Sequence, residues 1–283
     1  MKTEEQYHFP KTGIHRYVAK YIRAQNDLTG KVVLDIPCGD GRSSYEFLKK
    51  GAVIKAFDLF PHFMKLTETE AEYADLTETL PVEDNSVDYI ICQEGIEHVP
   101  NQLRVLEEFN RVLRKDGVLI ITTPNYSHFR ARLSRFFGES DYWQRMAPTE
   151  VDSIWFSENE SNKLYFGHLF LLGVQHFQSL LAFSGFKTRQ RLKTDIGTTS
   201  LVLGLVFYPL MAIFSIVSFG FYRKKNAHLD PVTKDRILWK RVKLNLSPKT
   251  LFCKHIFWVL SKENELHEML ARLKKMHRIS KHV

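Results

Sequence analysis

The segment Glu94-Gly95-Ile96-Glu97-His98 holds the residue types that could do chemistry in this chain. Two carboxylates three positions apart and an adjacent imidazole, all within one tight turn, could converge on a hard divalent cation such as Mg²⁺ or Mn²⁺. His98 could instead act as a general base without a metal. In a structural alternative, Glu97 pairs with His98 or caps a helix. The segment follows a predicted buried strand over residues 86–94, so its position depends on the sheet.

Two glycines earlier in the chain indicate a nucleotide pocket. Residues 32–35 have the pattern of a buried strand that stops at Asp35, and the chain then turns through Gly39 and Gly41 into the helical pattern of residues 43–50. Glycine lets a ligand approach the backbone, and the first turn of a helix presents free N–H groups. A strand, a glycine turn and a helix in this order are typical of nucleotide-binding folds.

The order of the predicted elements is that of a doubly wound α/β domain. A second strand over 53–58 ends in Asp58, where such a sheet places an acid for ribose hydroxyls. Asp75 follows a helix-like stretch and suits the adenine edge. A helical pattern over 103–113 then leads to a strand over 118–125. We therefore predict a Rossmann-like, mostly parallel sheet with its ligands at the strand C-termini.

Together these residues resemble the class I S-adenosylmethionine-dependent methyltransferases. Four motifs follow the family's order over roughly residues 30 to 190: LD-x-x-CG-x-G from Leu34, EHV from Glu97, RVL-x-x-x-G-x-L-x-x-x-TPN ending at Asn125, and LL-x-x-x-GF ending at Phe186. Pro37 stands where the family has the first glycine of the turn. A nicotinamide enzyme fits less well, because Ser44 stands in place of the third glycine of G-x-G-x-x-G.

The resemblance also implies ligands. It implies S-adenosyl-L-methionine as the cofactor, held by Asp35, Pro37, Gly39, Gly41, Asp58, Leu59, Asp75, Leu76 and Gln93. The pattern E-x-x-E-H is similar to the metal site of small-RNA 2′-O-methyltransferases and of ubiquinone-pathway O-methyltransferases, where a divalent ion holds the acceptor oxygen. It implies His98 and Glu97 as catalytic residues, and as metal ligands Glu94, Glu97, His98 and His168.

An apolar run over residues 200–222 contains no charged residue and is long enough to cross a bilayer. Basic residues precede the run and also follow it, at Arg223-Lys224-Lys225, so both flanks favour the cytoplasmic side. Proline breaks helices, and Pro209 lies near the middle of the run. We therefore expect a hairpin that dips into one leaflet in preference to a full span. A buried helix of a soluble domain is the alternative.

The net charge of +8 comes entirely from the C-terminal part. Residues 223–283 hold 16 Lys and Arg against 5 Asp and Glu, whereas residues 1–222 hold 24 against 27. Basic residues interleaved with Trp239, Phe252, Phe257 and Trp258 suit a lipid headgroup interface. We expect membrane lipids and a lipid-linked or membrane acceptor as partners and no nucleic acid, at the cytoplasmic face of a membrane, in particular a bacterial inner membrane. The three separated cysteines indicate a reducing compartment.

These observations predict four parts of the chain: an N-terminal lid or helix over 1–29, an S-adenosylmethionine-binding domain over 30–198 with an insertion over 126–167, a membrane segment over 199–223, and a basic tail over 224–283. The insertion carries Arg130, Arg132 and Arg135 with aromatic residues such as Trp143 and Trp155, which suit phosphates and sugar rings or acyl chains.

The predicted function is that of a membrane-associated O-methyltransferase. Family members with a TPN strand, an arginine-bearing insertion and an apolar C-terminal segment often accompany bacterial surface-polysaccharide synthesis, so the resemblance implies a lipid-linked glycan or glycolipid acceptor. A quinone or prenylated phenol is the alternative acceptor. A membrane-bound scaffold that binds the cofactor without turnover is the alternative from another class.

Overall fold

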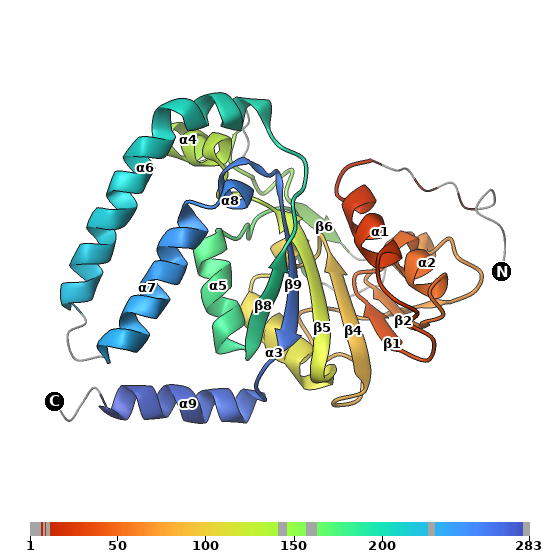
Figure 1. Cartoon of the computed structure of the whole chain (residues 1–283). Helices are drawn as coiled ribbons and strands as arrows, with labels where there is room; N and C mark the ends of the chain where they lie inside the picture. The colour runs from red at the N-terminus through yellow and green to blue at the C-terminus, as the bar shows by residue number, and fades with distance from the viewer. Residues whose placement is uncertain are drawn as a thin grey trace.

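The computed structural model describes Tyr7, Phe9 and residues 12–140, 146–156, 163–225 and 230–279, which leaves Trp143 outside the described residues. Seven strands form one sheet in the order β3-β2-β1-β4-β5-β9-β8 (Figure 1). Their bounds are β1 Val32–Asp35, β2 Val53–Asp58, β3 Ala71–Tyr73, β4 Val87–Gln93, β5 Leu113–Pro124, β8 Phe186–Arg191 and β9 His255–Lys262. Strands β1 to β5 pair in parallel, whereas β9 is antiparallel to both β5 and β8. The predicted Rossmann-like, mostly parallel sheet is confirmed.

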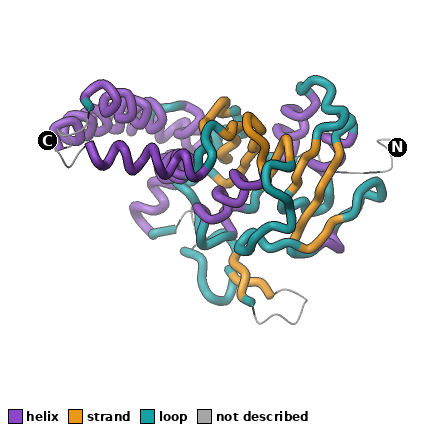
Figure 2. The backbone as a smooth tube through the Cα atoms, turned by 90° about the horizontal axis from the view of Figure 1, so that it is seen from below, coloured by secondary structure: helices purple, strands orange, loops and turns teal. Residues whose placement is uncertain are grey.

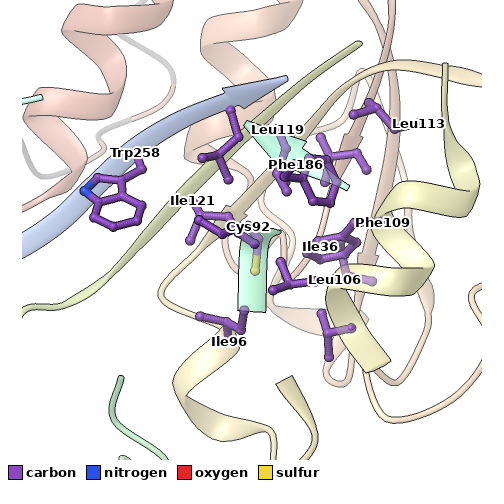
Figure 3. Packing of buried hydrophobic residues seen from close by; sticks show 14 of the residues in the cluster. Ile36, Cys92, Ile96, Leu106, Phe109, Leu113, Leu119, Ile121, Phe186 and Trp258 are labelled. Atoms are coloured by element: carbon purple, nitrogen blue, oxygen red, sulfur yellow. The ribbon is translucent and has the colours of Figure 1, made fainter. Parts of the chain in front are cut away.

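Helices cover both faces of this sheet. One face packs against α1 and α2, the other against α3 and α5, and alternate sheet residues divide between two apolar clusters accordingly. Figure 3 shows Ile36, Cys92, Leu119 and Ile121 of the sheet together with Phe109 of α3. The helix bounds are α1 His15–Arg23, α2 Arg42–Leu48, α3 Gln102–Val112, α4 Phe129–Gly138, α5 Val174–Phe183, α6 Thr198–Lys225, α7 Pro231–Asn245, α8 Pro248–Phe252 and α9 Leu266–Ile279.

One local prediction needs correction and another is confirmed. The helix-like stretch before Asp75 forms only a 3₁₀ turn at Pro61–Phe63 and the short strand β3. The stretch gives too short an apolar periodicity for a stable helix. The predicted N-terminal helix is confirmed as α1, whose Val18 and Ile22 are buried against the sheet.

Strand β9 overturns the predicted basic tail over 224–283. Phe257 and Trp258, expected at a headgroup interface, are 1% and 4% exposed and face the two opposite apolar clusters. Trp258 stacks on Phe177 of α5, with ring centroids 5.0 Å apart. A run that is apolar at every position is typical of a strand buried on both faces. The methyltransferase-like domain therefore does not end at residue 198, and residues 199–254 are an excursion between β8 and β9.

The chain leaves and re-enters the sheet at one point. Ile196 forms a β-bridge with Cys253, and the Gly197 N–H donates to the Phe252 carbonyl at 3.0 Å. Asn125, the residue after β5, donates through Nδ2 to the Thr250 and Cys253 carbonyls at 2.8 and 2.7 Å. The asparagine of the TPN sequence thus ties the end of β5 to the start of β9.

Helix α6 is, among the described residues, the one helix whose length and composition would allow it to cross a membrane. It runs unbroken through Pro209 and is bent, with its first arm over α4 and its second beside α7 (Figure 1). Proline removes one backbone hydrogen bond and kinks a helix without ending it when neighbours support it. The predicted hairpin within 200–222 is therefore wrong, because α6 is one continuous helix and the chain returns through a second helix, α7.

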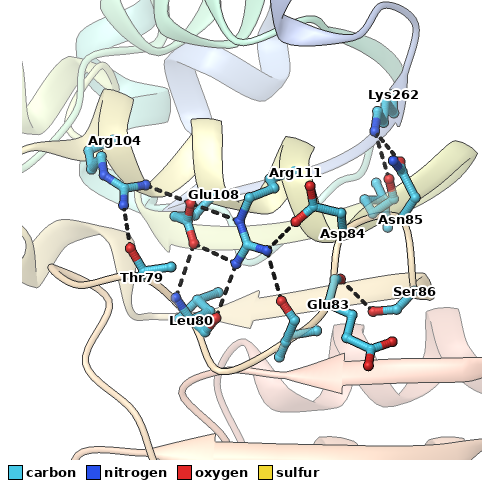
Figure 4. Close-up of polar contacts among 12 residues, drawn as sticks. Thr79, Leu80, Glu83, Asp84, Asn85, Ser86, Arg104, Glu108, Arg111 and Lys262 are labelled. Atoms are coloured by element: carbon cyan, nitrogen blue, oxygen red, sulfur yellow. Dashed lines mark hydrogen bonds and ion pairs between the residues drawn. The ribbon is translucent and has the colours of Figure 1, made fainter.

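A polar network joins α3 to the loop before β4 and to the end of β9, at the end of the sheet where the parallel strands β4 and β5 begin (Figure 4). Glu108 of α3 accepts from the Leu80 N–H at 3.0 Å and from Arg111 Nη2 at 2.8 Å, and Arg104 pairs with it at 2.8 Å. Lys262, at the end of β9, donates to Asn85 Oδ1 and to the Leu113 carbonyl. Burial alone would raise the pKa of Glu108, but the hydrogen bonds from Arg111, Arg104 and Leu80 lower it to about 2.

We expect Trp258→Ala to lower the free energy of unfolding by about 3–5 kcal/mol, because it empties a filled site between β9 and α5. Trp239→Ala is the matched control, since this tryptophan of α7 is 42% exposed, and its effect should stay below about 1 kcal/mol. Urea unfolding followed by circular dichroism measures both. Equal effects of the two variants would contradict the placement of β9.

Glu108 should make the protein sensitive to acid. The pKa of Glu108 is lower in the folded than in the unfolded protein. Its contribution to the free energy of unfolding is therefore complete above about pH 4.5 and is lost as the pH falls toward about 2. Glu108→Gln should destabilise the protein at neutral pH by about 1–3 kcal/mol. Urea midpoints measured from pH 7 to pH 3 should fall less steeply for Glu108→Gln than for the wild type. Parallel pH profiles would exclude this assignment.

Candidate active site

The turn after β1 is built around two tight contacts. The chain passes through a cis Ile36–Pro37 peptide bond and enters α2 at Gly41, whose φ is +86°. A Cβ on Gly41 would lie 2.4 Å from Met64 Sδ, so both its conformation and its surroundings require glycine. Pro37 packs against the turn after β4, where a Cβ on Gly95 would lie 2.4 Å from Pro37 Cδ. Proline in place of the family's glycine thus brings the two turns together.

A cavity of about 510 Å³ opens at the C-terminal edge of β1, β2 and β4. Seven of the nine predicted cofactor residues line it: Pro37, Gly39, Asp58, Leu59, Asp75, Leu76 and Gln93. Phe60, Phe63 and His15 line it as well and were missed by the sequence analysis. The position of these residues matches the expectation that ligands bind where parallel strands end.

Asp35 and Gly41 do not line the cavity, which corrects their assignment as contacts. Asp35 is 1% exposed and accepts a hydrogen bond from Ser44 Oγ at 2.6 Å. Burial raises the pKa of Asp35 to about 7, and the Ser44 hydrogen bonds oppose that rise. Asp35 therefore holds the first turn of α2 from beneath, while Gly41 shapes the turn.

The two other predicted acids lie along the cavity wall. Asp58 accepts from the Gly39 N–H at 2.8 Å and from the Phe60 N–H at 2.9 Å, so its carboxylate joins the turn after β1 to the turn after β2. Asp75 accepts from the Thr77 N–H at 2.7 Å and pairs with Lys163. Burial alone would raise the pKa of Asp75, but Lys163 and Thr77 hold it below its usual value. Both carboxylates are thus fixed hydrogen-bond acceptors.

His15 contributes the start of α1 to the same cavity. Its Nδ1 contacts the amide of Gln93, and the Gln93 Oε1 accepts from Ser43 Oγ at 2.9 Å. Burial, followed by the charge of Arg42, lowers the pKa of His15 to about 4. The amphipathic pattern of residues 14–22 was the signal for this contribution, because one side chain of that helix reaches the cavity while the others fill the core.

Three of the four predicted metal ligands lie close together, and the fourth, Glu94, does not. Ligand atoms of Glu97, His98 and His168 lie within 4.8 Å of one another. Glu97 is fully buried, and neither of its carboxylate oxygens makes a hydrogen bond of ordinary geometry within the described part of the chain. Burial and the neighbouring Glu94 raise its pKa well above the usual value. A buried carboxylate without hydrogen bonds next to two imidazoles fits a divalent cation.

Glu94 stands apart from this group, in contrast to the prediction that it is a fourth ligand. It accepts from Thr122 Oγ1 at 2.8 Å, and its other oxygen lies 3.6 Å from His255 Nε2. Burial raises the pKa of Glu94 to about 7, and Thr122 opposes that rise. His255 comes from the start of β9, so no local signal in the sequence could have placed it here.

His98 has a defined tautomer. Its Nδ1 lies 2.9 Å from the Phe166 carbonyl oxygen, which can only accept, so Nδ1 carries the proton and Nε2 of the neutral ring is free to accept. Burial, followed by the charge of His168, lowers the pKa of His98 to about 4. His98 lines the cavity and therefore presents a neutral base at neutral pH.

The insertion supplies an aromatic wall instead of a phosphate site. Its strands β6 Ile154–Phe156 and β7 Leu164–Phe166 form the strand hairpin that projects from the body in Figure 2, and Trp155, Tyr165 and Phe166 line the cavity. The three described arginines of the insertion, Arg130, Arg132 and Arg135, do not line it. Arg132 donates to the Ser127 carbonyl and to Asn245, and Arg135 donates to Tyr126.

Comparisons with known proteins agree with this geometry. Residues 34–121 match a family model described as a methyltransferase domain. The chain is 30% identical to a ubiquinone biosynthesis O-methyltransferase of Coxiella burnetii over 47% of this chain and 64% of that protein. A protein of the same name from Xanthomonas oryzae is 32% identical over 37% of this chain and 48% of that protein. The chain thus spans less than two thirds of the length of these relatives.

A solved structure supports the fold. A Listeria monocytogenes protein assigned to the S-adenosylmethionine-dependent methyltransferases aligns with a TM-score of 0.50 at 11% identity, over 88% of this chain and 98% of that one. The sheet order, the glycine turn and the family match define a class I S-adenosylmethionine-dependent methyltransferase domain. The cofactor of this class is S-adenosylmethionine.

We expect Asp58→Ala to weaken S-adenosylmethionine binding by about 1–3 kcal/mol, that is, about fivefold to 150-fold, since Asp58 is a fixed acceptor beside the expected ribose. Isothermal titration calorimetry measures the Kd. Glu83→Ala is the control, because Glu83 is exposed at the opposite edge of the sheet (Figure 4). An unchanged Kd for Asp58→Ala would remove Asp58 from the ribose site.

Proposed function

We propose that this protein is an O-methyltransferase that moves the methyl group of S-adenosylmethionine to a hydroxyl of an aromatic, quinone-type acceptor. The observation that carries the proposal is His98, a neutral imidazole of fixed tautomer in the wall of the cofactor cavity. A hydroxyl must lose its proton as its oxygen attacks the methyl carbon and the carbon–sulfur bond breaks. His98 Nε2 is the group that accepts this proton.

Glu97, His98 and His168 would alternatively hold a divalent cation such as Mg²⁺ or Mn²⁺; His98 Nε2 would then be a metal ligand, and the hydroxyl proton would leave to water instead of to His98. The fit rests on the buried Glu97 carboxylate, which lacks ordinary hydrogen bonds and shares a 4.8 Å cluster with two imidazoles. When bound, such an ion lowers the pKa of a hydroxyl and fixes its oxygen. The Phe166 carbonyl orients His98 in either case, because it holds the Nδ1 proton.

The aromatic acceptor is favoured by the shape of the cavity wall. Trp155 lies against His98, with ring centroids 4.7 Å apart, and Tyr165 is joined to Tyr73 through their hydroxyls at 3.3 Å. Flat apolar faces beside the base suit an aromatic ring. Two relatives are named ubiquinone biosynthesis O-methyltransferases, which supports a phenol of this kind.

A lipid-linked glycan or glycolipid hydroxyl is the second candidate acceptor. Its support was the arginine-bearing insertion, and Arg132 and Arg135 are engaged in hydrogen bonds within the protein. A scaffold that binds the cofactor without turnover is the remaining alternative. Mass spectrometry of reactions with labelled S-adenosylmethionine distinguishes the three. We expect label in a catechol or demethylated quinone precursor, whereas label in a glycolipid fraction alone, or in no product, would favour the alternatives.

We expect His98→Ala to lower kcat at least about a hundredfold while the Kd for the cofactor stays unchanged, since the residue acts on the acceptor proton. His176→Ala is the matched control, because His176 is exposed on α5. Loss of cofactor binding together with turnover would show instead that His98 maintains the fold of the cavity.

We expect EDTA to abolish turnover and added Mg²⁺ or Mn²⁺ to restore it, because Glu97 and the two histidines would lose their ion. His168→Ala should raise the metal concentration needed for half-maximal activity. Full turnover in excess chelator would exclude the ion and leave His98 as a base that acts alone.

A further inference from the structure

The outward side of α6 is apolar and exposed along its whole length. Leu205, Val206, Ile213, Phe214 and Phe221 are between 62 and 83% exposed. The buried residues of α6 are Ser200, Gly204 and Ser215. This arrangement is the reverse of an ordinary surface helix, which turns its apolar stripe toward the core. A continuous exposed apolar face of this length marks a contact with a lipid or protein surface.

Small and polar residues hold α6 against the body. Ser200 Oγ contacts the Arg130 N–H at 3.3 Å and Ser215 Oγ accepts from Asn245 at 2.9 Å. A Cβ on Gly204 would lie 2.6 Å from the ring of Phe252, so α6 and α8 meet at that glycine. Lys234 of α7 donates to the Arg223 carbonyl at 2.9 Å near the end of α6. These contacts extend from one end of α6 to the other.

The topology excludes a single span by α6. Strand β9 follows α6 in the chain and lies in the same sheet as the strands that precede α6, so the chain must return to the side from which it left. The return segment is α7, which has only 15 residues and includes Lys234, Asp235, Arg236, Lys240, Arg241 and Lys243. Such a helix is too short and too charged to cross hydrocarbon.

A basic groove lies next to this pair of helices. Arg236, Lys240 and Lys243 fall on one side of α7 at helical spacing and line a cavity of about 800 Å³ together with Arg191 and Trp239. No ion pair reaches Arg236, Lys240 or Lys243 within the described residues. Trp239 connects the groove to α6, because its ring lies 4.6 Å from that of Phe219. Unpaired cations beside an aromatic ring and an apolar helix complement an anionic headgroup layer.

We propose that α6 lies in the plane of an anionic phospholipid surface, with its outward side among the acyl chains and the groove of Arg191, Arg236, Lys240 and Lys243 on lipid phosphates. The proposal is independent of the reaction. It replaces a membrane span with a monotopic attachment, in which the whole sheet stays on one side.

This attachment also brings the cavity edge to the lipid. The first arm of α6 lies over α4 (Figure 1), and α4 follows the C-terminal end of β5 at the edge where the cofactor cavity opens. Phe136 and Phe137 near the end of α4 are 80 and 73% exposed. An acceptor with an apolar tail would therefore reach the cavity without leaving the membrane.

The test is sedimentation of the full-length protein with vesicles. We expect binding to vesicles of equal parts phosphatidylcholine and phosphatidylglycerol, weaker binding to phosphatidylcholine alone, and a loss of the difference at high salt. The triple variant Leu205→Ser, Phe214→Ser, Phe221→Ser should lose at least about tenfold in partitioning to both. Circular dichroism and cofactor binding check that this variant is folded.

A second variant set separates charge from apolar contact. Arg236→Gln, Lys240→Gln and Lys243→Gln together should remove the preference for phosphatidylglycerol and leave binding to phosphatidylcholine unchanged. The matched control is Lys20→Gln, Lys55→Gln and Lys115→Gln, which removes three exposed lysines elsewhere and should behave as the wild type. If both triple variants lose the preference for phosphatidylglycerol equally, the preference depends on the protein's net charge, and the groove has no specific role.

Sidedness tests the in-plane placement. Thr199→Cys and Lys225→Cys lie near the two ends of α6, and the three native cysteines are buried. In a bacterial host, an impermeant maleimide should label both positions in inverted membrane vesicles and neither in spheroplasts. Labelling from opposite sides would establish a span. If the protein binds no vesicles and sediments as a dimer that the α6 variant abolishes, a second copy of the chain covers α6. Labelling from opposite sides or such a dimer would overturn the proposal.

Discussion

The pairing of β9 between β5 and β8 is the constraint on which the rest of the structure depends. It places Phe257 and Trp258 in the two opposite cores, so neither face of the sheet is complete until residues far from the glycine turn have returned. Asn125 holds the point of return through two carbonyls of the loop before β9. The excursion that contains α6 and α7 must therefore begin and end at one edge, beside the cofactor cavity.

The carboxyl and imidazole groups around Glu97 favour their neutral forms because they are buried. Burial raises the pKa of Glu94 and Glu97 and lowers that of His98, His168 and His255. Because burial disfavours the charged form of each group, an unpartnered charge is costly there, and a cation or a proton that enters supplies the partner that a buried carboxylate lacks. Asp58 and Asp75 lie on the cofactor side of the cavity, where backbone N–H groups donate to their carboxylates.

Sequence reasoning succeeded where the signal was local. The strands, the glycine turn and the acids at strand ends all lie within residues 32–125, and each has its own periodicity or spacing. Side-chain direction was less accessible, because the pattern that identifies Asp35 as the end of β1 does not say whether its carboxylate faces the cavity or α2. Pairing between distant strands was inaccessible, since the summed charge of residues 223–283 concealed the one apolar strand within them. The arginines of the insertion show the same limit, because composition does not reveal which guanidinium is already bonded internally.

The contact between Pro37 and Gly95 links two positions that are far apart in the chain. Pro37 fills the space that a side chain at position 95 would need. The two residues therefore form one packing unit, and each restricts what the other position can be. In this chain, glycine at position 37 would remove the two ring atoms nearest to a Cβ at position 95 and would leave Cys92 Sγ, at 3.3 Å, as its nearest neighbour. A larger residue at position 95 is therefore accommodated only together with a change at position 37, so the two turns constrain each other's sequence.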